Sequence, residues 1–209
     1  ERLNGGVCEF YRDTDIRELR KILLGAKNLF EGSLFMCEYG GLGLYWPEST
    51  VRSSKFVIPP TRSMYEAKNF FVNTLKRQIE KAVLKGIVKP LICIEASAVA
   101  RYLMEAGIDR VDLEVTYDKF IELYYSAVKG AAMCYGKETF GTDMAMVWYG
   151  GNEQDCLWRH RWKTSLYHAF IRGADPIYAE HGLMDYRALG KDLDKNAPEV
   201  KMFRKELGD

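Results

Sequence analysis

Two hydrophobic patterns alternate along the chain. In residues 15–30, apolar side chains recur every three or four positions, which predicts an amphipathic helix with one buried face. In residues 91–95, the run LICIE is apolar up to its final acid, which predicts a short buried strand. Helices are predicted on this basis over 15–30, 63–85, 96–107, 117–136 and 155–173 and near 196–203, and strands over 6–10, 34–38, 89–95, 108–114, 142–151 and 175–180.

Two of the predicted helices carry large apolar residues at helical spacing. In the helix over 117–136, the residues expected to face inward are Phe120, Ile121, Tyr124, Ala127, Val128 and Ala131. The helix over 155–173 carries Trp158, Trp162, Leu166 and Phe170 at four-residue spacing. His160 and His168 lie in the second helix, where a surface or packing role is expected.

Regular alternation of strands and helices predicts an α/β fold with a parallel sheet. Two architectures compete, an open doubly wound sheet and a closed (β/α)8 TIM-type barrel. The segment CEFYRDTD after the first predicted strand lacks the glycine fingerprint of a dinucleotide-binding sheet. Apolar strands that end in polar residues favour the barrel. We therefore expect residues 1–209 to form a single, partial barrel domain of about six strand-helix units, a fragment of a longer polypeptide.

Acidic residues stand at or near the ends of the predicted strands. They are Glu9, Glu38, Glu95, Glu114, Asp143 and Glu180. Burying a carboxylate without a partner is unfavourable, so such residues are expected to face solvent, a metal or a shared polar site. In a barrel the carboxyl ends of all strands meet at one mouth, where the active site lies. The acids are thus predicted to converge there, with Glu9 included only if its strand is the first. Alternatively, they are rim residues or favourable charges at helix N-termini.

Aromatic residues follow several of these strand ends. Tyr39, Tyr45 and Trp46 lie in a glycine-rich segment, and Trp148 and Tyr149 belong to VWYGG. Flat rings there can stack on the apolar faces of sugars, or simply pack loops onto the barrel rim. Carboxylate pairs beside such rings suit glycoside hydrolysis, in which one acid protonates the leaving oxygen and another attacks the sugar or activates water.

The stretch 136–187, GKETFGTDMAMVWYGG to GADPIYAEHGLMDYR, resembles the later barrel units of microbial glycoside hydrolase-like proteins. The similarity is to the clan that contains the family 42 β-galactosidases, and it extends over about residues 90–190. In that clan both the acid/base and the nucleophile are glutamates at strand ends. The acid/base glutamate there commonly follows an asparagine, whereas Glu114 follows Leu113.

The resemblance and the strand-end pattern together predict a set of site residues. Glu180 is expected to act as nucleophile or base and Glu114 as general acid, while Asp143 positions a sugar hydroxyl or tunes a glutamate. His181 is expected to bind substrate or to orient Glu180. The predicted substrate-binding residues are Glu38, Tyr39, Trp46, Glu95, Trp148, Tyr149 and His181. No cofactor is required in this interpretation.

Two other functions remain open. Glu95, Glu114 and Asp143 end successive units and could hold Mg²⁺ or Mn²⁺, as in a metal-dependent isomerase or enolase-like enzyme. No lysine base is evident near a strand end, since Lys129 and Lys137 fall in or after a helix. Alternatively, the chain is a carbohydrate-binding barrel without a working acid pair, because fold alone does not decide function.

Composition and charge limit the classes of partner that the chain is expected to bind. The 30 basic and 29 acidic residues nearly balance and form no basic block, which argues against nucleic acid. No apolar run reaches the roughly 20 residues of a membrane helix, so we expect a soluble protein that binds carbohydrate and not a membrane. The five scattered cysteines form no CxxC pair and match neither a disulfide framework nor a zinc site. The sequence does not decide whether the chain forms homo-oligomers. It also does not decide between a cytoplasmic location and export by a signal that is absent from this chain.

Overall fold

The structure is a computed structural model that describes residues 33–37, 60–84, 89–116, 120–146, 156–178 and 205. The strands are β1 (Ser33–Cys37), β2 (Leu91–Glu95), β3 (Arg110–Val115), β4 (Gly141–Met144) and β5 (Ile177–Tyr178). The helices are α5 (Met64–Leu84), α6 (Ala100–Ala106), α7 (Ile121–Cys134) and α8 (Cys156–Arg172). The elements predicted at 6–10, 15–30 and near 196–203 lie outside the described residues. Within these residues, the predicted alternation of strands and helices is confirmed.

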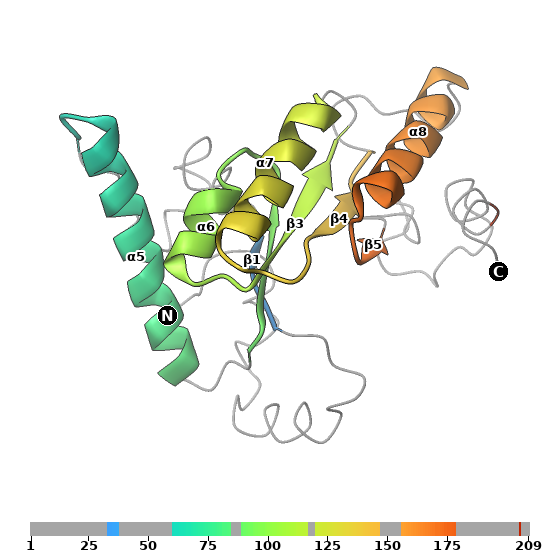
Figure 1. Ribbon diagram of the computed structural model, residues 1–209. Helices are drawn as coiled ribbons and strands as arrows, with labels where there is room; N and C mark the ends of the chain where they lie inside the picture. Colours follow the sequence, from blue (N-terminus) through green and yellow to red (C-terminus); the bar gives the residue numbers. More distant parts are fainter. Residues whose placement is uncertain are drawn as a thin grey trace, which may run out of the picture.

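The strands form one parallel sheet whose spatial order, β1-β2-β3-β4-β5, follows the sequence (Figure 1). Right-handed crossovers that always step in the same direction place their helices on one face of a sheet. Accordingly, α5, α6, α7 and α8 pack one against the next, and α6, α7 and α8 contact the strands. A doubly wound sheet reverses its strand order at a switch point, and the five described strands show no reversal.

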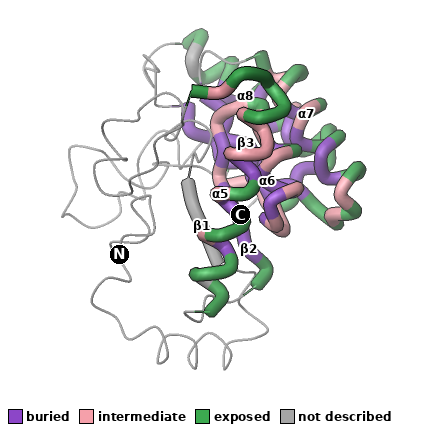
Figure 2. The backbone as a smooth tube through the Cα atoms, turned by 90° about the vertical axis from the view of Figure 1, so that its left-hand side faces the viewer, coloured by how far each residue is buried: buried purple, intermediate pink, exposed green. Residues whose placement is uncertain are grey.

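The core lies between the sheet and this helix layer, where the buried segments gather (Figure 2). Alternate strand residues enter it, because successive side chains of a strand point to opposite faces. The strand residues in the core are Leu91, Cys93, Val111, Leu113, Val115 and Met144, and they meet Leu103, Met104, Tyr125, Val128, Trp162 and Leu166 from the helices. Burying each large apolar side chain contributes about 1.5–3 kcal/mol. The remaining strand side chains point to the other face of the sheet, away from this core.

Two residues of these apolar series are exposed. Phe120 is 77 % exposed because it precedes the first turn of α7, and Tyr125 enters the core in its place. Phe170 is 71 % exposed, whereas Ala169 is buried. A helix turns about 100° per residue, so residues spaced by four drift about 40° around the axis at each step. Two such steps from Trp162 carry Phe170 off the buried face.

Glycine is required where α6 gives way to β3. Gly107 has a φ of 114°, a left-handed conformation that L side chains rarely adopt, and its N–H bonds the last turn of the helix. The N–H of Ile108 then donates to the carbonyl of Leu103 at 3.1 Å, and the N–H of Asp109 donates to that of Leu91 at 2.9 Å. This tight reversal sets the start of β3 against the start of β2.

Among the described helices, none has both the length and the hydropathy to cross a bilayer.

Candidate functional site

The two faces of β3 differ in chemistry. Val111, Leu113 and Val115 belong to the core under the helices. Strand alternation places the intervening residues, Arg110, Asp112 and Glu114, on the opposite face. Asp112 and Glu114 are only 1 % and 7 % exposed, so these are buried carboxyl groups. The face of the sheet that turns away from the helices is therefore polar along β3.

Glu114 and Asp143 are neighbours on this polar face. They are register partners in the parallel pairing of β3 with β4, at the carboxyl end of both strands. Asp143 is 3 % exposed and is in turn paired with Tyr178 of β5. Neighbouring strands lie about 4.8 Å apart, so in-register side chains on one face are adjacent. The structure thus brings together two of the three predicted catalytic residues.

Asp112 lies one layer nearer the amino ends of the strands and accepts several hydrogen bonds. The Nε and Nη2 atoms of Arg110 donate to its two oxygens at 2.8 and 3.0 Å, and the Tyr178 hydroxyl donates to Oδ2 at 3.1 Å. The backbone N–H of Gly141, its register partner on β4, donates to the same carboxyl group. A Cβ atom at Gly141 would overlap this carboxyl group, so any larger residue there would have to displace Asp112.

Burial dominates the electrostatics of this cluster. Burial raises the pKa of Asp112, while the hydrogen bonds and charge of Arg110 act in the opposite direction. Burial also raises the pKa of Tyr178 far above its usual value, and the negative charges of Asp112 and Asp143 raise it further. The Tyr178 hydroxyl therefore keeps its proton and acts as a hydrogen-bond donor over the whole physiological pH range.

Glu95 lies elsewhere. Its register partner is Leu113, so alternation places it on the face opposite to Glu114 and Asp143. It is fully buried, and its Oε1 accepts hydrogen bonds from the N–H of Ser97 at 2.9 Å and from the Ser97 hydroxyl at 2.7 Å. The other predicted site residues, Glu38, Tyr39, Trp46, Trp148, Tyr149, Glu180 and His181, lie outside the described residues.

The sequence interpretation missed Arg110, Asp112, Gly141 and Tyr178. A signal for the first two was present, because polar residues at 110, 112, 114 and 116 alternate with Val and Leu. That period of two indicates a strand with one polar face along its whole length. The acids in the predicted site were all at or near strand ends, so Asp112 in the middle of β3 was not among them. Tyr178 and Gly141 carry no such signal, since their roles depend on the pairing of β3, β4 and β5.

No group of three or more His, Cys, Asp or Glu side chains within the described ranges is arranged to hold a metal ion. The Mg²⁺ or Mn²⁺ alternative therefore gains no support from this part of the chain.

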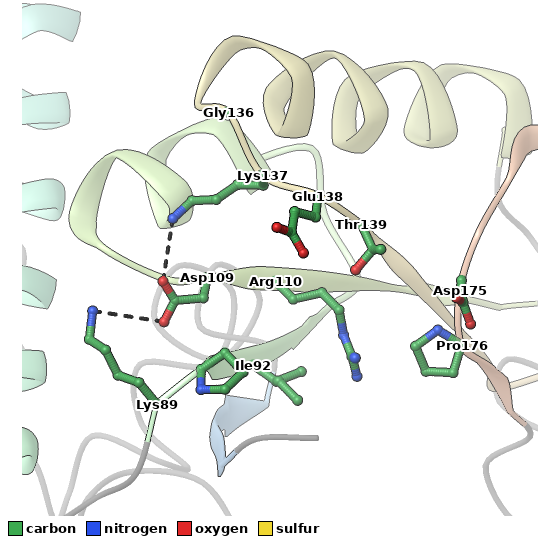
Figure 3. A pocket seen from close by; sticks show the side chains of 11 residues that line it. Lys89, Ile92, Asp109, Arg110, Gly136, Lys137, Glu138, Thr139, Asp175 and Pro176 are labelled. Atoms are coloured by element: carbon green, nitrogen blue, oxygen red, sulfur yellow. Dashed lines mark hydrogen bonds and ion pairs between the residues drawn. The ribbon is translucent and has the colours of Figure 1, made fainter. Parts of the chain in front are cut away.

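A pocket of about 720 Å³ lies at the opposite edge of the sheet, by the amino ends of β2 and β3 and the segments that lead into β4 and β5 (Figure 3). Lys89 and Lys137 reach Asp109 from two sides, at 3.8 and 3.5 Å. The third basic residue of the lining, Arg110, is bonded to Asp112. These three cationic groups already have acidic partners, so the carboxyl end of the sheet is the stronger candidate site.

Comparison with protein-family models, curated proteins and solved structures finds no match to this chain.

Proposed function

We propose that this chain is part of a glycoside hydrolase built on a (β/α)8 barrel. The observation that carries the proposal is the buried, in-register pair of Glu114 and Asp143 at the carboxyl end of β3 and β4. The sequential order of the described strands, with the described helices packed one against the next, supports the barrel, because barrel strands follow one another in this way. In barrel enzymes, carboxyl ends of strands carry the catalytic groups.

The proposed reaction divides the work among three acids. Glu114 donates a proton to the glycosidic oxygen as the bond from that oxygen to the sugar carbon breaks. Glu180, which follows Tyr178 by two residues, either attacks that carbon, to form a glycosyl-enzyme that water then hydrolyses, or removes a proton from the water that attacks the carbon directly. Asp143 accepts a hydrogen bond from a sugar hydroxyl and holds Glu114 in place. The predicted aromatic residues Trp46, Trp148 and Tyr149 complete the sugar site.

Hydrolysis of a panel of nitrophenyl glycosides and plant and microbial oligosaccharides tests this proposal. Glu114→Gln and Glu180→Gln are each expected to lower kcat about 10²–10⁴-fold, the usual contribution of acid-base groups. Glu122→Gln is the matched control, because Glu122 is an exposed acid on α7, and it should hydrolyse like the wild type. Circular dichroism establishes that each variant is folded.

The outcomes separate the alternatives. A wild-type protein that binds oligosaccharides but cleaves none of them would indicate a carbohydrate-binding barrel. Sugar isomerisation that needs added Mg²⁺ or Mn²⁺ would indicate the metal-dependent enzyme. Hydrolysis with an unchanged kcat in Glu114→Gln would exclude Glu114 as the general acid. If hydrolysis is found, the anomer of the first product identifies a retaining or an inverting reaction.

A further inference from the structure

Tyr178 links three strands on the polar face of the sheet. It lies on β5 beside Asp143 of β4, yet its hydroxyl bonds Asp112 of β3, 66 residues away in the sequence. The residue of β4 at the level of Asp112 is Gly141. Because glycine has no side chain, the carboxyl group of Asp112 occupies the space where a Cβ would stand. The tyrosine side chain thus reaches past β4 to the strand beyond.

The acceptor of this bond is itself held by neighbouring groups. Asp112 receives a two-pronged bond from Arg110 on its own strand and the N–H of Gly141 from the next. A carboxylate offers about four lone-pair sites, and these donors together with Tyr178 use them. Asp112 therefore acts as a fixed anchor and is poorly suited to exchange protons with a substrate.

We propose that Tyr178 is a positioning residue of the hydrolase site, which rests on the function proposed above. Its hydroxyl is anchored by Asp112, and the residue is the register partner of Asp143. From this position Tyr178 holds the Asp143 carboxylate, and through it Glu114, in the orientation that the reaction uses. Supporting contacts of this kind keep the groups of a catalytic site in the geometry that the reaction requires. A misplacement of about 1 Å can lower a rate on the order of 100-fold.

The test compares two tyrosines whose hydroxyls bond on opposite sides of the sheet. Tyr178→Phe removes the bond to Asp112 and keeps the ring. Tyr125→Phe is the matched control, because the Tyr125 hydroxyl bonds the Thr142 hydroxyl at 2.9 Å on the helix side of β4. Both variants lose one side-chain hydrogen bond and should lower the melting temperature. Only Tyr178→Phe is expected to lower kcat, by about 10- to 100-fold, with KM changed less than twofold.

A double-mutant cycle with Asp112→Asn tests whether the residues act through one another. If Tyr178 acts through its anchor, adding Asp112→Asn to Tyr178→Phe lowers kcat much less than Asp112→Asn does alone. Equal losses of kcat in both backgrounds, or a wild-type kcat in Tyr178→Phe, would overturn the proposal. Failure of the proposed function looks different, because the wild-type protein itself would then cleave no glycoside.

A spectroscopic measurement tests whether Asp143 acts on Tyr178 and needs no activity assay. In protein labelled with ¹³Cζ-tyrosine, the signal absent from Tyr178→Phe identifies Tyr178. Asp143→Asn should move this signal, since the charge of Asp143 acts on Tyr178, whereas Glu122→Gln should leave it in place. A Tyr178 signal that ignores Asp143→Asn would show that the ring does not contact this acid and would overturn the positioning role.

Discussion

Glu114 of β3 and Asp143 of β4 are register partners at the carboxyl end of a parallel sheet, on the face that turns away from the helices. Two segments separated by a complete helix thus place buried acids side by side. This follows from parallel pairing, in which every strand presents its carboxyl end at the same edge. The same pairing aligns Gly141 with Asp112 and Tyr178 with Asp143, and it makes the packing of this face testable residue by residue.

The space beside Asp112 is the first test. Gly141→Ala places a methyl group against the carboxyl group of Asp112 and is expected to destabilise the fold by about 1–3 kcal/mol. Gly130→Ala is the matched control, since a Cβ there meets nothing within 4 Å and the position is an exposed turn of α7. It should stabilise by about 0.5–1 kcal/mol, as alanine does in helices. Urea unfolding measures both, and equal effects would contradict the close approach at Gly141.

The bond between Tyr125 and Thr142 joins α7 to β4 inside the core. Removing the Thr142 hydroxyl by Thr142→Val leaves a buried phenol unpaired and should destabilise by about 1–3 kcal/mol. In a Tyr125→Phe background the same substitution is expected to have a much smaller effect, because neither polar group remains. Chemical unfolding of the four proteins gives the coupling. Purely additive effects would show that the two hydroxyls do not interact.

Alkaline pH should weaken the fold through Tyr125. Burial raises the pKa of Tyr125 to about 12, above its unfolded value of 10.0. A raised pKa in the folded state contributes stability that is complete below pH 10 and is lost as the pH rises toward 12. The free energy of unfolding measured against pH should thus fall less steeply in Tyr125→Phe than in the wild type over this interval. Parallel curves would contradict the shift.

Acidic pH acts on a different contact, between α5, α6 and the end of α7. The Glu105 carboxylate accepts a hydrogen bond from the Lys68 ammonium group at 2.7 Å and another from the Tyr135 hydroxyl at 3.0 Å. The bond with Lys68 is the main cause that lowers the pKa of Glu105 below 4.5. A lowered pKa contributes stability that is present above pH 4.5 and is lost as the pH falls through the folded value. Melting temperatures of wild type and Glu105→Gln should therefore differ at pH 6 and converge on the acid side. A difference that persists at pH 2 would argue against this ion pair as its source.

The hydrogen bond between the start of β2 and Asp109, the residue before β3, provides the last test. The N–H of Leu91 donates to Oδ2 of Asp109 at 2.8 Å, so Asp109→Ala leaves a buried donor without its acceptor. The expected loss is about 1–3 kcal/mol. Lys89→Ala is the control, because Lys89 is 57 % exposed and lies 3.8 Å from the same carboxyl group. Its effect should stay within about 0.5 kcal/mol, and a larger one would show that the Lys89 contact matters.

Local patterns predicted much of the secondary structure. The apolar run LICIE and the helical spacing in 117–136 led to β2 and α7 within a few residues. The same patterns placed Phe120 in the core and included Phe170 in an apolar series, whereas both are exposed. A helix has 3.6 residues per turn, so residues spaced by four drift gradually around its axis and leave the buried face. Tertiary packing selected Tyr125 and Ala169 instead.

The sequence by itself determined the alternation of strands and helices and the presence of Glu114 and Asp143 in two of the strands, because these follow from the order of apolar and polar residues along the chain. Only the tertiary structure decided which residues meet. Register pairs Glu114 with Asp143, turns Glu95 to the other face, and allows Tyr178 to reach Asp112 past Gly141. A strand exchanges its two faces with a shift of one residue, so such contacts depend on pairing between distant segments, which the period of a single strand does not specify.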